Sequence, residues 1–210
     1  MSPTITINIH SSIRIAGAEK VIRFDPFKIG DAPHDADVIF ITHAHYDHFS
    51  PEDIRRVSKP DTVFVAPKSM GKQLAKEGLT HTVLLRPGET ATVQGLPVEA
   101  VAAYNSFKPF HPKSAGCLGY VVTVDGQRIY AAGDTDAVRE VQAVRCDIAL
   151  VPIGGTYTMN VKAAAAVVNT IRPKIAIPIH YGAIAGKPED GEHFRQLVED
   201  GIAVELLIGT

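Results

Sequence analysis

The sequence lacks most of the features that would assign it to a special class of protein. It has no apolar run long enough to cross a membrane, and its first residues show neither the basic segment nor the apolar core of a secretory signal. The two cysteines, Cys117 and Cys146, are not spaced as a metal-binding pair, so we expect reduced thiols and a cytoplasmic protein. The net charge of −2, without a basic stripe, argues against nucleic acid as a partner.

The composition is that of an ordinary globular protein. Hydrophobic residues make up 45% of the 210 residues and charged residues 21%, which is enough apolar material for a sizeable core. We find no internal repeat, low-complexity tract or linker. We therefore predict one domain over residues 1–210 that does not contact a membrane. Assembly into a homo-oligomer stays open.

Hydrophobic periodicity and turn residues predict a strand-rich first half, followed by helices that alternate with strands. The predicted strands are 5–9, 13–15, 21–24, 38–41, 63–65, 82–85, 90–93, 98–103, 120–124, 128–132, 148–151, 175–179 and 204–208. The predicted helices are one that begins at 51 and those over 68–76, 136–144, 160–171 and 190–199. This order favours an α/β (α+β) fold in which helices cover mixed sheets.

The most informative stretch is IFITHAHYDHFSPEDI, residues 39–54, because an apolar strand leads directly into a cluster of metal-binding side chains. Residues i and i+2 of an extended segment point to the same side, so His43 and His45 can share one metal ion. Asp47 and His48 follow where the backbone can turn their side chains toward a second point. Imidazole and carboxylate groups suit Zn²⁺, Mn²⁺ or Fe²⁺.

Further candidate ligands follow other predicted strands. Asp134 comes just after the strand 128–132, and His180 directly follows the strand 175–179, each with a glycine close by. His111 lies in a proline-rich loop. Because ligands collect at the carboxyl ends of strands, we expect these side chains to complete the site that the first cluster begins.

These motifs resemble those of the metallo-β-lactamase-fold superfamily of metallohydrolases. The segment His43–His48 matches the H-x-H-x-D-H signature of that superfamily. Gly133–Thr135 resembles its bridging-aspartate motif, and Pro178–His180 its last histidine motif. Other segments are similar to its small ascorbate-6-phosphate-lactonase-like branch, namely Ile9–Ser12, Phe24–Phe27 and Val151–Met159.

The resemblance implies both an architecture and a metal site. The implied fold is a four-layer αββα sandwich of two mixed β-sheets flanked by helices. The implied site holds two divalent metal ions, with Zn²⁺ as the first choice and Mn²⁺ or Fe²⁺ as alternatives. The family layout places His43, His45 and His111 on the first ion, Asp47, His48 and His180 on the second, and Asp134 between both.

Four more residues are candidates for roles around the metal ions. His10 would line the site, although a place in the core stays open. Asp25 would orient a metal-binding histidine, or serve only the turn before a proline. Lys108 and Lys113 flank His111 and would meet an anionic substrate if they are not simply solvated.

We predict a metal-dependent hydrolase that uses a hydroxide held by two metal ions to cleave a small ester, lactone or phosphoester. If Lys108 and Lys113 face the substrate, we expect that substrate to be anionic. Asp134 would couple the ions, and Asp47 is the candidate proton donor to the leaving group. One alternative is a nucleotide phosphodiesterase or nuclease. Another is a mononuclear iron redox enzyme on the same fold, against which the presence of both Asp47 and His48 argues.

Overall fold

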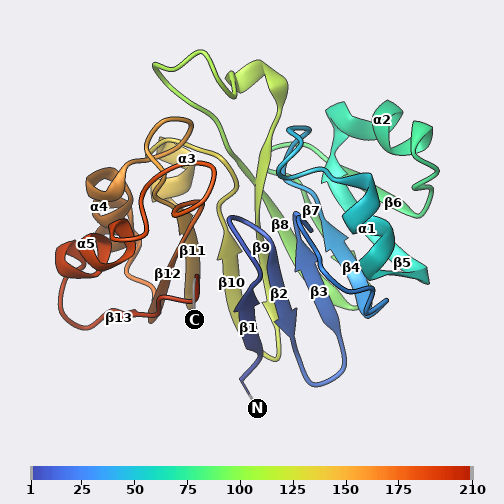
Figure 1. Cartoon of the computed structure of the whole chain (residues 1–210), viewed down its shortest axis with the longest axis horizontal. Helices are drawn as coiled ribbons and strands as arrows, with labels where there is room; N and C mark the ends of the chain where they lie inside the picture. The colour runs from blue at the N-terminus through green and yellow to red at the C-terminus, as the bar shows by residue number, and fades with distance from the viewer. Residues whose placement is uncertain (1, 209–210) are drawn as a thin grey trace.

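The computed structural model describes residues 2–208, whose strands form two sheets (Figure 1). The first sheet contains, in spatial order, β1 (Thr4–Ile7), β2 (Ile13–Ala16), β3 (Val21–Phe24), β4 (Ala36–Phe40), β5 (Ser58–Pro67) and β6 (Thr82–Leu85). The second contains β13 (Ala203–Val204), β12 (Ile175–Ile179), β11 (Ile148–Pro152), β10 (Gln127–Ala131), β9 (Leu118–Val124), β8 (Leu96–Ala102) and β7 (Thr90–Val93).

Both sheets are mixed. In the first sheet β1, β2 and β3 pair antiparallel, whereas β3, β4, β5 and β6 pair parallel. In the second sheet β7 to β10 pair antiparallel, and β10 to β13 pair parallel. A hairpin joins β9 and β10 through Asp125 and Gly126, both at positive φ, as a tight turn between twisted strands requires.

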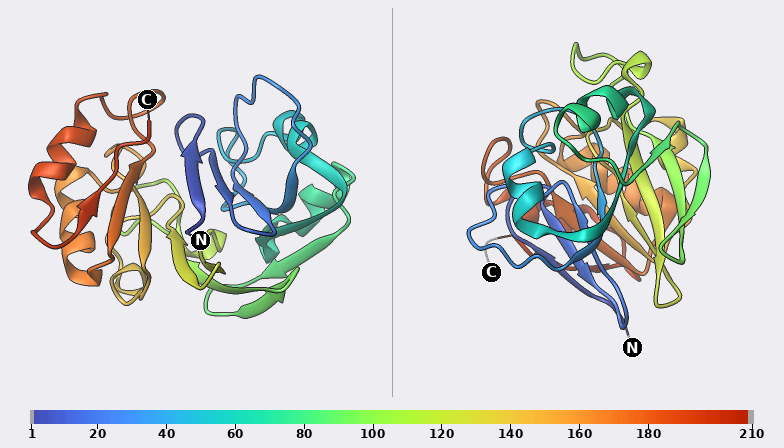
Figure 2. Two further views of the ribbon diagram at one scale, coloured as in Figure 1. Left: turned by 90° about the horizontal axis from the view of Figure 1, so that it is seen from below. Right: turned by 90° about the vertical axis from the view of Figure 1, so that its right-hand side faces the viewer.

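Helices cover the outer face of each sheet, which gives four layers (Figure 2). The helices α1 (Pro51–Val57) and α2 (Gly71–Lys76) pack on the first sheet, and α3 (Arg139–Gln142), α4 (Val161–Ile171) and α5 (Asp190–Leu197) pack on the second. Between the sheets lies a core to which both contribute, including Ile15, Phe40 and Leu118. The predicted αββα arrangement of two mixed sheets is confirmed.

Strand β4 shows why the sequence reads as an unbroken apolar run before the histidine cluster. Phe40 belongs to the core between the sheets, while Ile39 and Ile41 pack outward against Ile54 of α1 and Leu74 of α2. Because both faces are buried over Val38–Ile41, all four of these positions are apolar. The strand is thereby fixed at the point where the loop with His43–His48 begins.

The predicted helix starts at Ser50 and Asn160 are confirmed. The hydroxyl of Ser50 accepts a hydrogen bond from the backbone N–H of Asp53, with Pro51 as the first helical residue. The side-chain oxygen of Asn160 accepts from the N–H of Ala163 at 2.9 Å, so this residue caps α4.

Some elements are shorter than predicted. The helix predicted over 136–144 is the single turn α3, because the backbone of Val138 is extended, with φ −78° and ψ 162°, and the helix begins only after it. The strand predicted over 204–208 pairs only at Ala203–Val204, after which Glu205 makes one bond to Ala176. None of the helices within residues 2–208 is long and apolar enough to cross a membrane.

Two other predicted elements begin or end differently. The predicted strand 5–9 ends at Ile7, because the chain turns so that the N–H of Asn8 bonds the carbonyl oxygen of Ser12 at 2.9 Å. The helix predicted over 68–76 starts as a 3₁₀ turn, η1 (Lys68–Met70), before α2.

Candidate metal centre

The candidate site lies at the edge of the sandwich where β4, β10 and β12 end. The loop after β4 carries His43–His48, Asp134 follows β10, and His180 directly follows β12. Gly133 makes the turn into Asp134 with a φ of +64°, and a Cβ there would lie 2.8 Å from the carbonyl oxygen of Leu118. Only glycine fits this position, so the aspartate can sit close against the end of its strand.

Three histidines converge at one side of this edge. The Nδ1 of His45 lies 3.1 Å from the Nε2 of His43 and 3.0 Å from the Nε2 of His111. The Nδ1 of His111 lies 2.9 Å from the side-chain oxygen of Asn105, and that of His43 lies 3.0 Å from the hydroxyl oxygen of Thr42. Protons on these Nδ1 atoms leave both Nε2 atoms bare. Burial holds the pKa of His43 well below its usual value, so its imidazole is neutral.

The second group surrounds the carboxylate of Asp134. Its Oδ1 lies 3.3 Å from the Nε2 of His48, and its Oδ2 lies 3.1 Å from the Nε2 of His180. The same Oδ2 is 3.5 Å from the Nε2 of His111, which belongs to the first group of histidines. Asp47 stands nearby, with its Oδ2 3.6 Å from the Nε2 of His48. Asp134 therefore faces both groups.

Several buried polar atoms of this cluster lack hydrogen-bond partners. Three of them lie around Asp134, namely its own Oδ1 and the Nε2 atoms of His48 and His180. Leaving such an atom unsatisfied costs about 1–3 kcal/mol, so a protein that buries three together has a further use for them. Imidazole nitrogens and carboxylate oxygens that face one another are the donor set of a divalent transition metal, and the residues present fit such an ion.

The electrostatics of the cluster favour positive charge at its centre. Burial alone would lower the pKa of His48, but nearby carboxylates outweigh burial and raise that pKa to about 9. These carboxylates belong to Asp134, Asp25 and Asp47. Burial alone would raise the pKa of Asp134, yet His180 and His48 hold it well below its usual value. Ionised carboxylates grouped around imidazole nitrogens stabilise a cation between them.

Comparison with known proteins agrees with the fold and the site. A family described as the beta-lactamase superfamily domain matches residues 4–180. The chain belongs to the β-lactamase superfamily. The resemblance predicted from the sequence motifs is therefore confirmed.

Relatives of this superfamily member are similar over most of their length. A metal-dependent hydrolase of Thermoplasma acidophilum is 35% identical over 200 residues, which cover 90% of this chain and 87% of the relative. The crystal structure of a metal-dependent hydrolase from Parabacteroides distasonis has a TM-score of 0.82 to this chain at 34% identity. The match covers 97% of this chain and 92% of that chain. A metallohydrolase of Ignicoccus hospitalis has a TM-score of 0.79 at 25% identity, with 98% and 95% covered. This protein is accordingly a metal-dependent hydrolase.

In this superfamily member, Asp25 holds His48 in place. Its Oδ2 accepts a hydrogen bond from the hydroxyl of Thr42 at 2.6 Å and lies 2.7 Å from the Nδ1 of His48. Its Oδ1 accepts from the backbone N–H of Thr42 at 2.8 Å. Because Asp25 engages the Nδ1 of His48, the Nε2 faces Asp134 and is the nitrogen that a metal ion could bind. These contacts match an orienting role and exceed what a turn before Pro26 needs.

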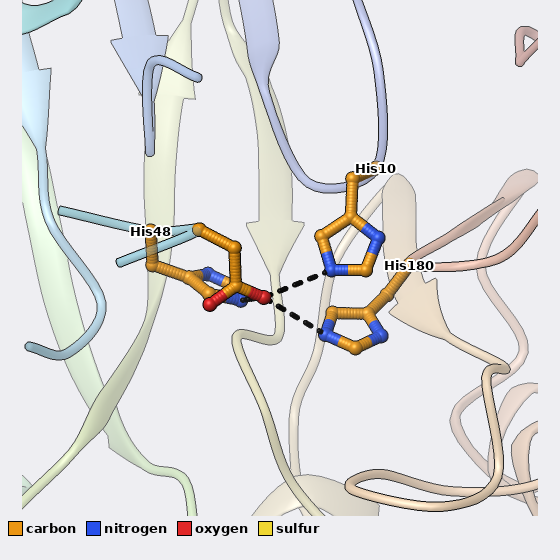
Figure 3. A group of neighbouring side chains, drawn as sticks. His10, His48 and His180 are labelled. Carbon is orange, nitrogen blue, oxygen red and sulfur yellow. Dashed lines mark hydrogen bonds and ion pairs between the residues drawn. The ribbon is translucent and has the colours of Figure 1, made fainter. Parts of the chain in front are cut away.

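His10 lies inside the site instead of in the apolar core. Figure 3 shows His10, His48 and His180 grouped around the same point. The His10 side chain is fully buried, its Nε2 lies 3.2 Å from the Oδ2 of Asp47, and its ring centroid is 3.7 Å from that of His180. Because an ionised carboxylate only accepts, the Nε2 carries the proton. The backbone of His10 has a φ of 57°, a left-handed conformation that residues serving only to pack rarely adopt.

Replacing His10 with Asn is expected to weaken metal binding about 10-fold, the lower end of the effect of removing a group that orients a ligand. Asn tolerates the left-handed backbone but is too short to reach Asp47. Metal retained after dialysis against a chelator measures the effect, and His193→Asn, at an exposed histidine, is the control. A lower melting temperature with unchanged metal binding would instead mean that His10 only packs.

The two predicted lysines are held in ion pairs. The Nζ of Lys108 lies 2.7 Å from the Oδ1 of Asp136 and also donates to the carbonyl oxygen of Thr158. The Nζ of Lys113 lies 2.8 Å from the Oε1 of Glu140. Neither lysine lines the two cavities that adjoin the cluster. Their contact with an anionic substrate stays a prediction.

Sequence reasoning missed two residues that hold the histidines. The hydroxyl of Thr42 donates to Asp25, and its oxygen also contacts the Nδ1 atoms of His43 and His48. Asn105 fixes the ring of His111. The available signal for Thr42 was a polar residue at the end of an apolar strand. Nothing in the sequence linked Asn105 to His111, because the loop between them had no predicted conformation.

Proposed function

We propose that this protein is a dinuclear metallohydrolase that cleaves a small ester, lactone or phosphoester. His43, His45 and His111 would hold one divalent cation, Asp47, His48 and His180 a second, and Asp134 would lie between the two. Zn²⁺ is the first choice for this donor set. The observation that carries the proposal is the position of Asp134, whose buried carboxylate lies within 3.5 Å of nitrogens from both groups.

Two such cations, when bound, would lower the pKa of a water molecule and polarise the scissile bond. The residues of the chain determine where that chemistry happens. The Asn105 and Asp25 contacts engage the Nδ1 atoms of His111 and His48, so the Nε2 atoms of both rings point at the site. The ionised carboxylate of Asp47, held by the Nε2–H of His10, borders a cavity and would take a proton from the attacking water and pass it to the leaving group.

The buried thiol near the site is a poor nucleophile. Burial, helped by the nearby charge of Asp134, raises the pKa of Cys117 to about 11, so the thiolate is scarce near neutral pH. An activated water is therefore the nucleophile that the proposal uses.

The first test of this proposal is metal content. Protein purified in zinc-supplemented buffer is expected to hold about two ions per chain, because the donor atoms form two groups joined by one carboxylate. His43→Ala and His180→Ala should each lose at least one ion, as measured by elemental analysis and native mass spectrometry. The exposed His193→Ala variant, away from the cluster, is expected to keep both.

A folded protein that binds no zinc, or that binds one ion unaffected by His180→Ala, would contradict the dinuclear assignment. A second test identifies the bond that is cleaved. It measures turnover of a panel of lactones, carboxylic esters, phosphodiesters and thioesters by protein of known metal content. Hydrolysis of none of these would reject the proposed reaction while leaving the metal assignment intact.

A further inference from the structure

A cavity of about 250 Å³ opens directly beside the metal cluster. Its floor includes His45, Asp47 and Asp134, so any molecule that fills it lies next to the proposed reacting centre. The volume is roughly that of a benzene-sized cavity with room for several further carbon atoms, since about 150 Å³ accommodates benzene in an apolar protein cavity.

The wall of this cavity consists of large apolar side chains from separate loops. They are Tyr46, Phe110, Tyr157 and Ile184. The rings of Phe110 and Tyr157 meet edge to face with their centroids 4.8 Å apart, which joins the loop after β8 to the loop after β11. Tyr46 is 68% exposed and Phe110 is 37% exposed. Exposed aromatic rings beside a cavity provide surface that a ligand can cover.

The charge of the cavity restricts what this wall can bind. No lysine or arginine lines the cavity among the described residues, and its formally charged members are Asp47 and Asp134. The two lysines that flank Phe110 in the chain, Lys108 and Lys113, are engaged by Asp136 and Glu140. An anionic group placed against the wall would find no protein cation there, whereas a neutral apolar group would bury Tyr46 and Phe110.

We infer that this cavity binds a neutral, apolar part of the substrate, either an aryl group or a medium-length acyl chain, beside the bond that is cleaved. The inference rests on the proposed function, and it narrows the substrates to esters and lactones that carry such a group. It also replaces the anionic preference that the sequence suggested through the lysines.

Hydrolysis of three methyl esters tests the inference, because they share one leaving group. The metal-loaded protein is expected to hydrolyse methyl phenylacetate with a kcat/KM at least ~10-fold above that of methyl acetate, as expected when a ring is bound in an apolar pocket. Monomethyl succinate, which is anionic, should lie below methyl phenylacetate. Phe110→Ala and Tyr157→Ala should reduce the preference for phenylacetate to about 2-fold or less, on the same grounds.

Phe107→Ala is the matched control, because Phe107 lies on the same loop, is 99% exposed and does not line the cavity. It should leave the preference for phenylacetate unchanged. A preference for monomethyl succinate, or one for phenylacetate that survives both Phe110→Ala and Tyr157→Ala, overturns the inference.

Binding of α-naphthol separates this inference from the proposed reaction. The sequence has no tryptophan, so naphthol fluorescence can be followed without interference from an indole. Phe110→Ala and Tyr157→Ala should each weaken its binding at least ~5-fold, as expected for loss of a buried ring contact, while Phe107→Ala should not. This pattern without turnover of any ester would support the cavity and reject the proposed hydrolysis. Ester turnover together with naphthol binding that is insensitive to these variants would support the proposed hydrolysis and reject the binding role of the cavity.

Discussion

Asp134→Asn is expected to keep the fold and to lose at least ~10²-fold in kcat, as occurs when a group that stabilises charge in an active site is removed. A carboxylate has two oxygens that can each face a cation, and those of Asp134 point toward His48 on one side and toward His180 and His111 on the other. Asn preserves the shape but removes the negative charge. It also presents to one of the two histidine groups an NH₂ group, which cannot serve as a metal ligand.

Metal content and kcat, measured on the same preparation, check this expectation. Occupancy of the second metal should fall, and circular dichroism should remain unchanged because β10 is anchored by buried residues such as Ile129 and Tyr130. Asp136→Asn is the control, since Asp136 is a carboxylate two positions along the chain that pairs with Lys108 outside the cluster. Full activity with two ions in Asp134→Asn would show that Asp134 is not the bridge, and the second metal site would have to be reassigned.

Asp25→Asn is expected to weaken metal binding by about 10–100-fold, the usual effect of losing a group that orients a metal-binding histidine. The carboxylate of Asp25 accepts from both the N–H and the hydroxyl of Thr42 and lies 2.7 Å from the Nδ1 of His48. Asn has one acceptor oxygen and a donor amide, so at least one of these contacts must be lost. The ring of His48 would then be free to turn its Nε2 away from Asp134.

Chelator titration followed by thermal unfolding, on protein with and without zinc, separates binding from stability. Asp53→Asn is a matched control, because the carboxylate of Asp53 also accepts from two backbone N–H groups, those of Lys28 and Ile29, but touches no histidine. Both variants should lose some stability, while only Asp25→Asn should lose metal affinity. If the two variants retain zinc equally well, Asp25 serves the turn and does not orient the metal site.

The amino-acid sequence by itself determined most of the elements and the main candidate ligands, because both depend on local spacing. The caps at Ser50 and Asn160 involve residues three positions apart, and the turn at Asp125-Gly126 needs two adjacent residues that tolerate positive φ. The cluster from His43 to His48 follows directly from its strand. Such features are complete within a few residues, so the sequence contains all that is needed to predict them.

Only the tertiary structure decided which distant groups meet. The segment before α3 is not helical, and there Asp136 contacts two residues far away in the chain, Tyr104 through its N–H and Lys108 through its carboxylate. The orientation of His111 depends on Asn105, and the position of His10 against Asp47 depends on a turn between β1 and β2.

The surroundings of the metal cluster were likewise decided by contacts between loops. Lys108 and Lys113 flank His111 in the chain, yet Asp136 and Glu140 from another loop hold them as ion pairs. The apolar wall joins Phe110 to Tyr157 across 47 positions, the difference of their residue numbers. Charge pairing and ring contact act through space over a few ångströms, whereas sequence patterns report only neighbours along the chain. The candidate ligands could therefore be proposed from the sequence, but the chemistry of the cavity around them required the fold.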